Sequence, residues 1–145
     1  MALSPGARVW GRALAVWALI ALTESVHGTL RQLFLAPVIG DFRARQVSVF
    51  TGSALILLVA YLLIRWIGAI RTWTLLRIGL LWLFLTLIFE VSLGRALGID
   101  WQRILADYDV TRGGLMLVGM VVLLLAPLVA ARMRGTWRSG AQTPR

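Results

Sequence analysis

Four long apolar segments dominate the pattern of hydrophobic and polar positions along the chain. They cover residues 10–30, 47–66, 75–93 and 115–131. Each is close to the ~20 residues that a helix needs to cross a bilayer. Leu, Val, Ile and Ala follow one another without the alternation of polar and apolar residues that a membrane β-barrel requires. The pattern therefore predicts an all-α membrane protein, a single bundle of four transmembrane helices.

The connections between these segments differ in length and polarity. Residues 32–46 are expected to form an external loop, apolar enough to lie in the membrane interface, with a turn at Gly40-Asp41. Residues 67–74 form a short loop, which predicts that the second and third helices are antiparallel neighbours. The sequence becomes polar after residue 134. We therefore predict a membrane domain over residues 1–134 and a polar C-terminal tail over residues 135–145.

The third connection contains the pattern of a short amphipathic helix. Asp100 is a residue type that accepts hydrogen bonds at helix N-termini. The apolar residues that follow it are spaced as one face of a helix. They are Trp101, Ile104, Leu105 and Tyr108. We expect a helix over residues 101–108, between the third and fourth spans, that lies along the periplasmic face of the membrane.

Composition narrows the chemistry that this chain can support. It has 145 residues, is 59% hydrophobic and only 14% charged, and contains no cysteine. Disulfides, thiolate metal sites and cysteine nucleophiles are therefore excluded. His27 is the single histidine, so one chain cannot form a multi-histidine metal centre, and no second Glu-x-x-His completes the Glu24-x-x-His27 half of a di-iron motif. We predict no metal site and no other cofactor.

Positive charge, supplied by arginine alone, is distributed unevenly. The N-terminus, the second loop and the C-terminus hold nine arginines, and the first and third loops hold six together with four aspartates. The positive-inside rule then predicts that both termini lie in the cytoplasm. This arrangement, and contact with anionic membrane lipids, account for the net charge of +9. Nucleic acid is therefore not predicted as a partner.

Two glutamates, Glu24 and Glu90, lie inside the apolar segments. A charge in hydrocarbon is costly, and such residues usually face the interior of a bundle or a water-filled cavity. In the predicted topology both lie in the outer halves of their helices. We expect the two carboxylates to face a common, outward-opening pocket. At least one should be protonated near neutral pH, because low-dielectric surroundings and a second carboxylate both disfavour ionisation.

Polar residues at the same depth complete the candidate site. Glu24, His27 and Arg31 are three and four residues apart and therefore share one helix face. The candidate catalytic residues are Glu24, Glu90 and His27, since carboxylates and an imidazole in a low-dielectric site suit general acid/base chemistry. The candidate ligand-binding residues are Arg31, Arg95, Thr86, Thr51 and Asp107.

Three hypotheses of function follow from these residues. The first is a membrane protein whose pocket binds, or performs acid/base chemistry on, an amphipathic or lipid-like small molecule from the outer leaflet. The second is a proton-coupled transporter or channel that works as a homo-oligomer, although the inner halves of the helices have few polar residues. The third is a structural subunit or assembly factor of a membrane complex, with the charges serving as contacts. A separate interpretation of the site itself is that Glu24–Arg31 and Glu90–Arg95 are structural pairs that satisfy one another near the interface.

Three patterns give the chain a resemblance to known proteins. They are Glu24-x-x-His27-Gly28-x-x-Arg31, Phe89-Glu90-x-x-x-Gly94-Arg95 and Trp101-x-x-x-Leu105-x-Asp107-Tyr108. From the first to the fourth helix, the chain resembles small, uncharacterised four-helix bacterial membrane proteins. The resemblance implies a multi-pass protein of the bacterial inner membrane and brings no established activity. The familiar small four-helix transporters and glutathione-linked membrane enzymes do not share these motifs.

Overall fold

The computed structural model describes residues 4–138, apart from the side chain of Arg112, and is helical over most of this range. The helices are α1 (Pro5–Leu30), the π-helical turn η1 (Arg31–Leu35), α2 (Ala36–Ile39), α3 (Asp41–Ile67), α4 (Thr72–Ala96), α5 (Trp101–Ala106), the 3₁₀ turn η2 (Val110–Arg112) and α6 (Met116–Met133). Four helical segments are long and apolar enough to cross a membrane. The prediction of an all-α chain with four such helices is confirmed.

The predicted external loop over residues 32–46 is wrong, because this stretch is helical. The chain continues from α1 through η1 and α2 as one helical segment, Pro5–Ile39, and α3 begins at Asp41. Gly40, with φ of +86°, makes the turn between them, as the Gly40-Asp41 pair predicted. Pro37 does not break the helix, since it lies in the first turn of α2, where no backbone N–H is needed. The apolar residues expected in a loop therefore extend the first helix.

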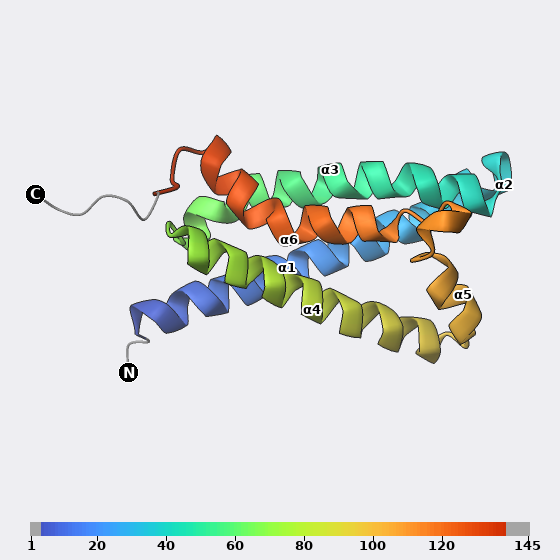
Figure 1. The fold of residues 1–145 in the computed structure, drawn as a ribbon, viewed down its shortest axis with the longest axis horizontal. Coiled ribbons are helices and arrows are strands. Elements are labelled where there is room, and N and C mark those ends of the chain that lie inside the picture. The colour runs from blue at the N-terminus through green and yellow to red at the C-terminus, as the bar shows by residue number, and fades with distance from the viewer. Residues whose placement is uncertain (1–3, 139–145) are drawn as a thin grey trace, which may run out of the picture.

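The four long helices lie along the long axis of the molecule in an antiparallel bundle (Figure 1). Helix α6 packs against both α3 and α4, and α1 packs mainly against α3. The prediction that the second and third spans are neighbours is therefore wrong, because α6 lies between α3 and α4. Gly79 of α4 explains this close packing of α6. A Cβ atom at Gly79 would stand 1.9 Å from the carbonyl oxygen of Leu124, so only glycine lets the two backbones approach this closely.

The start of α1 and the end of α6 lie at one end of the bundle, and α5 runs across the other end (Figure 1). We call these the terminal end and the α5 end. The short helix predicted over residues 101–108 is found as Trp101–Ala106, and the Asp100 carboxylate accepts a hydrogen bond of 2.9 Å from the Trp101 N–H, as predicted. Its position along a membrane surface stays a prediction.

The start of the predicted C-terminal tail folds back onto the bundle. The Trp137 indole N–H donates a 2.8 Å hydrogen bond to the Thr72 hydroxyl, and the Arg138 N–H donates to the Ile70 carbonyl. The rest of the tail, residues 139–145, lies outside the described residues. Contacts between residues 137–138 and residues 70–72 therefore help to hold the terminal end together.

The apolar core is concentrated in the half of the bundle near the termini. Trp82 is fully buried there, and its indole N–H donates a 2.9 Å hydrogen bond to the Ala13 carbonyl of α1. Helices α1 and α4 are described in full; α1 has no buried residue beyond Ile20, and Gly94 is the only buried residue of α4 beyond Trp82. The α5 ends of α1 and α4 are thus less tightly packed than their terminal halves.

Candidate functional site

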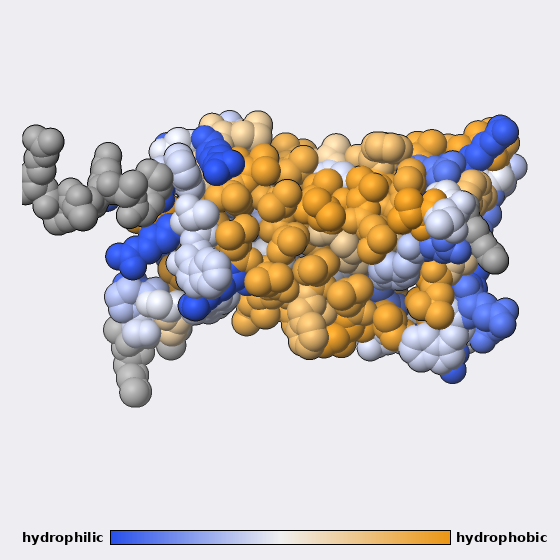
Figure 2. All heavy atoms as spheres, viewed as in Figure 1, coloured by the Kyte–Doolittle hydropathy of each residue, from blue (hydrophilic) through white to orange (hydrophobic). Residues whose placement is uncertain are grey.

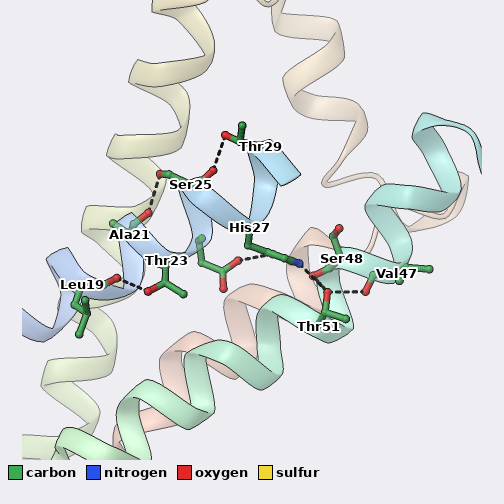
Figure 3. Close-up of polar contacts among 10 residues, drawn as sticks. Leu19, Ala21, Thr23, Ser25, His27, Thr29, Val47, Ser48 and Thr51 are labelled. Atoms are coloured by element: carbon green, nitrogen blue, oxygen red, sulfur yellow. Dashed lines mark hydrogen bonds and ion pairs between the residues drawn. The ribbon is translucent and has the colours of Figure 1, made fainter. Parts of the chain in front are cut away.

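The first polar group joins α1 to α3 at the α5 end of the bundle. His27 points from α1 towards Thr51 on α3, and its Nε2 lies 2.8 Å from the Thr51 hydroxyl (Figure 3). The other ring nitrogen, Nδ1, lies 3.4 Å from the Glu24 carboxylate. Glu24, His27 and Thr51, three of the predicted site residues, therefore form one hydrogen-bonded chain between two helices.

Small residues on α3 make room for this chain. Gly52 faces the Glu24 carboxylate, and a Cβ atom there would stand 2.7 Å from Oε2 of Glu24. Ala44 and Ser48 precede Gly52 at four-residue intervals on the same buried face of α3. Such a row of small residues lets two helices approach closely and brings a side chain of one against the backbone of the other.

Several buried polar atoms on α1, η1 and α3 have no partner among the described residues. They are Oε1 of Glu24, Nε of Arg31 and of Arg45, and the hydroxyl oxygens of Ser48 and Ser53. Ser48 is only 9% exposed. Ser48 lies one turn before Thr51 on α3, and the Thr51 hydroxyl is 3.4 Å from the Ser48 carbonyl.

The second polar group links α4 to the segment after α5. The Tyr108 phenol donates a 3.1 Å hydrogen bond to Oε2 of Glu90. Burial, together with the negative charges of Glu90 and Asp107, raises the pKa of the Tyr108 phenol above its ordinary value. Whether Glu24 and Glu90 open into one common pocket stays a prediction.

Thr86 and Arg95, two of the predicted ligand-binding residues, already have partners in the chain. The Thr86 hydroxyl accepts a 3.0 Å hydrogen bond from the indole of Trp17, which joins α1 to α4. The Arg95 guanidinium donates to the Ile99 carbonyl at 3.2 Å and lies 5.3 Å from the centre of the Trp101 ring. Thr86 thus belongs to the α1–α4 contact, and Arg95 to the turn between α4 and α5.

A third group ties the α5 segment to the start of α3. Asp107, predicted to bind a ligand, forms an ion pair with Arg45 at 2.7 Å. Arg45 also lies 3.3 Å from Asp41, and Asp41 pairs with Arg103 of α5. This network holds the segment that carries Tyr108 close to α3 and α4. Neither of the expected structural ion pairs, Glu24–Arg31 or Glu90–Arg95, is present among the residues described.

Sequence reasoning did not assign Tyr108, Arg45, Ser48 or Gly52 to the site. The amphipathic pattern over residues 101–108 uses Tyr108 only as its last apolar position, although the Tyr108 hydroxyl is a hydrogen-bond donor. The four-residue spacing of Asp41 and Arg45 is the signal for a helical ion pair, but it fell within the region predicted as a loop. Gly52 could be recognised only once α1 was placed beside it.

The described residues contain no group of three or more His, Cys, Asp or Glu side chains that could hold a metal ion. The side chains of Glu24, His27 and Thr51, which we call the α1–α3 group, donate and accept hydrogen bonds among themselves. No family model matches the chain, and no curated protein or solved structure is significantly similar to it. The assignment of function rests on the geometry described above.

Proposed function

We propose that this is a multi-pass protein of the bacterial inner membrane that binds the polar head of an amphipathic, lipid-like molecule at the α1–α3 group. The observation that carries the proposal is the set of three buried polar atoms without partners, on Glu24, Arg31 and Ser48. Buried polar atoms are almost always hydrogen-bonded, and each unsatisfied one costs about 1–3 kcal/mol. A bound polar head would satisfy them.

The properties of the three atoms define the head that fits. The Glu24 carboxylate oxygen accepts a hydrogen bond, the Arg31 Nε–H donates one, and the Ser48 hydroxyl does both. A head with an anionic oxygen for Arg31 and an ammonium or hydroxyl group for Glu24 would pair with all three. Its apolar tail would lie beside the α5 ends of α1 and α4, where apolar packing is sparse.

The membrane setting is supported by the distribution of surface hydropathy. On the face shown in Figure 2, apolar side chains form a continuous band across the middle of the molecule, and hydrophilic side chains gather towards its two ends. Such a belt fits the hydrocarbon layer, which α1, α3, α4 and α6 are long enough to cross. With the arginine-rich terminal end in the cytoplasm, the α1–α3 group would lie in the outer leaflet.

The Glu24–His27–Thr51 chain is suited to exchanging a proton with the bound head. The Thr51 hydroxyl lies 2.8 Å from His27 Nε2 and 3.3 Å from the Val47 carbonyl, so it can donate to either acceptor. If it donates to Val47, Nε2–H donates to Thr51, and Nδ1 and Glu24 share a second proton. If it donates to Nε2, Nδ1–H donates a hydrogen bond to the ionised Glu24 carboxylate. The first arrangement holds one proton more than the second, so the chain can release that proton to the bound head or take it up from it.

A binding site at one end of the bundle accounts for the geometry better than transport across it. In the described part of the chain, the core of the terminal half consists of residues such as Val16, Ile64 and Trp82, which provide no chain of titratable groups towards the cytoplasm. The alternative that Glu24 and Glu90 only form structural pairs with Arg31 and Arg95 is not supported, since the described residues form neither pair. The first of the three hypotheses is thus the best supported.

Photolabelling in a defined membrane tests the proposal. The protein is placed in vesicles of phosphatidylethanolamine and phosphatidylglycerol that contain a phosphatidylethanolamine with a photoreactive group near its head, and labelled residues are identified by mass spectrometry. We expect labels on the α5 ends of α1 and α3. Labelling should fall about tenfold in Glu24→Gln, because a charged hydrogen bond is worth about 1.5–3 kcal/mol. It should persist in Ser25→Ala, whose hydroxyl bonds, among the described residues, only the Ala21 carbonyl of its own helix.

A second variant keeps the test decisive if Glu24→Gln folds poorly. Ser48→Ala removes a buried hydroxyl that has no partner in the described residues, so it should not destabilise the fold but should reduce labelling. Labels spread evenly around the apolar belt, or equal labelling of wild type and Ser48→Ala, would contradict the proposal.

A further inference from the structure

The terminal end of the bundle concentrates positive charge without any aspartate or glutamate side chain to balance it. Its described arginines are Arg8, Arg12, Arg65, Arg71, Arg77, Arg132, Arg134 and Arg138. The six acidic residues of the chain all lie towards the α5 end; they are Glu24, Asp41, Glu90, Asp100, Asp107 and Asp109. No aspartate or glutamate of the chain therefore lies at the terminal end to neutralise these arginines.

Aromatic rings and backbone carbonyls position several of these arginines. The Arg12 guanidinium lies 5.3 Å from the Trp66 ring centre and donates a 2.8 Å hydrogen bond to the Trp66 carbonyl. Arg134 lies 4.4 Å from the Tyr61 ring centre and donates to the Tyr61 carbonyl at 2.8 Å. Such contacts orient a guanidinium but leave its full positive charge. The end is therefore a rigid cationic surface.

A hollow of about 550 Å³ opens in this surface between the start of α1 and the start of α4. Its polar lining includes Arg71, Thr74 and Arg77, and its apolar lining includes Val9, Trp10 and Ile70. Arg77 lies 5.3 Å from the centre of the Trp73 ring. No described carboxylate pairs with Arg71 or Arg77. The volume is in the range of small-molecule sites, which are about 300–1,000 Å³.

We propose that this hollow binds the phosphate group of an anionic glycerophospholipid from the cytoplasmic leaflet. Guanidinium groups bind phosphate oxygens through paired, charge-assisted hydrogen bonds, and a threonine hydroxyl can add a further donor. The rim supports a lipid rather than a free phosphate ion, because Trp10 and Ile70 are 37% and 41% exposed beside the phosphate-binding residues. These side chains would contact the glycerol backbone and the upper part of the acyl chains. The site is separate from the α1–α3 group, which lies at the opposite end of the bundle.

Native mass spectrometry of the full chain in a neutral detergent tests this inference. Dioleoylphosphatidylglycerol is titrated against the wild type and against the double variant Arg71→Gln/Arg77→Gln. A matched double variant, Arg8→Gln/Arg65→Gln, removes the same charge from the same end but outside the hollow. We expect one tightly bound lipid in the wild type, about tenfold weaker binding in the Arg71/Arg77 variant, and a change of less than about threefold in the control.

Two further probes identify what the hollow recognises. Dioleoylglycerol has the same acyl chains without the phosphate, and inorganic phosphate has no acyl chains. We expect dioleoylglycerol and inorganic phosphate each to bind much more weakly than the phospholipid. Equal losses in the two double variants, dioleoylglycerol binding as tightly as the phospholipid, or inorganic phosphate occupying the hollow without lipid would each overturn the proposal. Arg71 and Arg77 are exposed, so thermal unfolding of their variants should match that of the wild type and confirm that they fold.

Discussion

The phenol of Tyr108 donates a hydrogen bond to the carboxylate of Glu90 over 3.1 Å and so anchors the segment after α5 to α4. This contact joins a residue outside the predicted spans to a glutamate inside one. Burial and the charge of Glu90 both favour the neutral phenol, which raises the pKa of Tyr108 above its ordinary value. An alkaline titration therefore reports directly on the contact.

In a Tyr61→Phe background, Tyr108 is the only tyrosine of the chain. Its tyrosinate absorbance near 295 nm should appear at higher pH than that of a free tyrosine, which titrates near pH 10. The folded state binds the phenolic proton more tightly than the unfolded state. The stabilisation that comes from this proton is therefore fully present below about pH 10 and is lost as the pH rises above it. Glu90→Gln in the same background should move the titration to lower pH. A titration near pH 10 in both proteins would show that Glu90 does not act on Tyr108.

Gly52→Ala should displace the Glu24 carboxylate from α3. The new Cβ atom would stand 2.7 Å from Oε2 of Glu24, and that oxygen is the end of a flexible side chain that can swing away. We expect stability to change by less than about 1 kcal/mol, because the clash can be relieved without moving the backbone. The ¹⁵N resonances of His27, the single histidine, should shift as its contact with Glu24 is lost.

The control for Gly52→Ala is Gly11→Ala, where an added Cβ atom meets nothing within 4 Å. The imidazole resonances should stay in place in that variant. Unchanged resonances in Gly52→Ala would show that Glu24 does not lie against Gly52.

Gly79→Ala should destabilise the bundle much more than other glycine substitutions within its helices. The added Cβ atom would overlap the Leu124 carbonyl oxygen at 1.9 Å, and a backbone atom cannot swing away. Overpacking of this kind costs about 1–3 kcal/mol or more. The matched substitution on α6, Gly119→Ala, places its Cβ atom 3.9 Å from Val49 in ordinary contact and should be neutral or slightly stabilising. Unfolding of both variants in mixed detergent micelles would measure the difference; equal stabilities would contradict the α4–α6 packing.

Both termini should lie in the cytoplasm and α5 in the periplasm. Nine arginines flank the terminal end in sequence, and the other end carries all four aspartates. Alkaline phosphatase, which is active only in the periplasm, should be inactive when fused after residue 145. It should be active when fused within the turn between α4 and α5. The opposite result would invert the topology and place the α1–α3 group in the cytoplasmic leaflet.

Local features of the sequence were sufficient to predict the helices. A run of about 20 apolar residues must be helical to satisfy its backbone in a membrane, and this holds whatever the run packs against. The Asp100 cap and the apolar stripe after it also depend only on nearby residues. The sequence predicts a loop at residues 32–46, where the structure has helices. Gly40 clearly marks where a helix is interrupted, whereas the π-helical turn η1, through which the first helix continues, has a weaker sequence signal.

The sequence by itself determined that Glu24 and His27 share a helix face and that both glutamates lie at one depth, because helical spacing is a local property. Only the tertiary structure decided what each of them meets. His27 contacts Thr51, Glu24 lies against Gly52, and Glu90 receives the Tyr108 phenol. These partners are 18 to 28 residues away in sequence and are brought close by the packing of α1 on α3 and by the return of the α5 segment over α4. Such packing depends on how side chains from different helices fit together, and no periodicity within one helix contains that information.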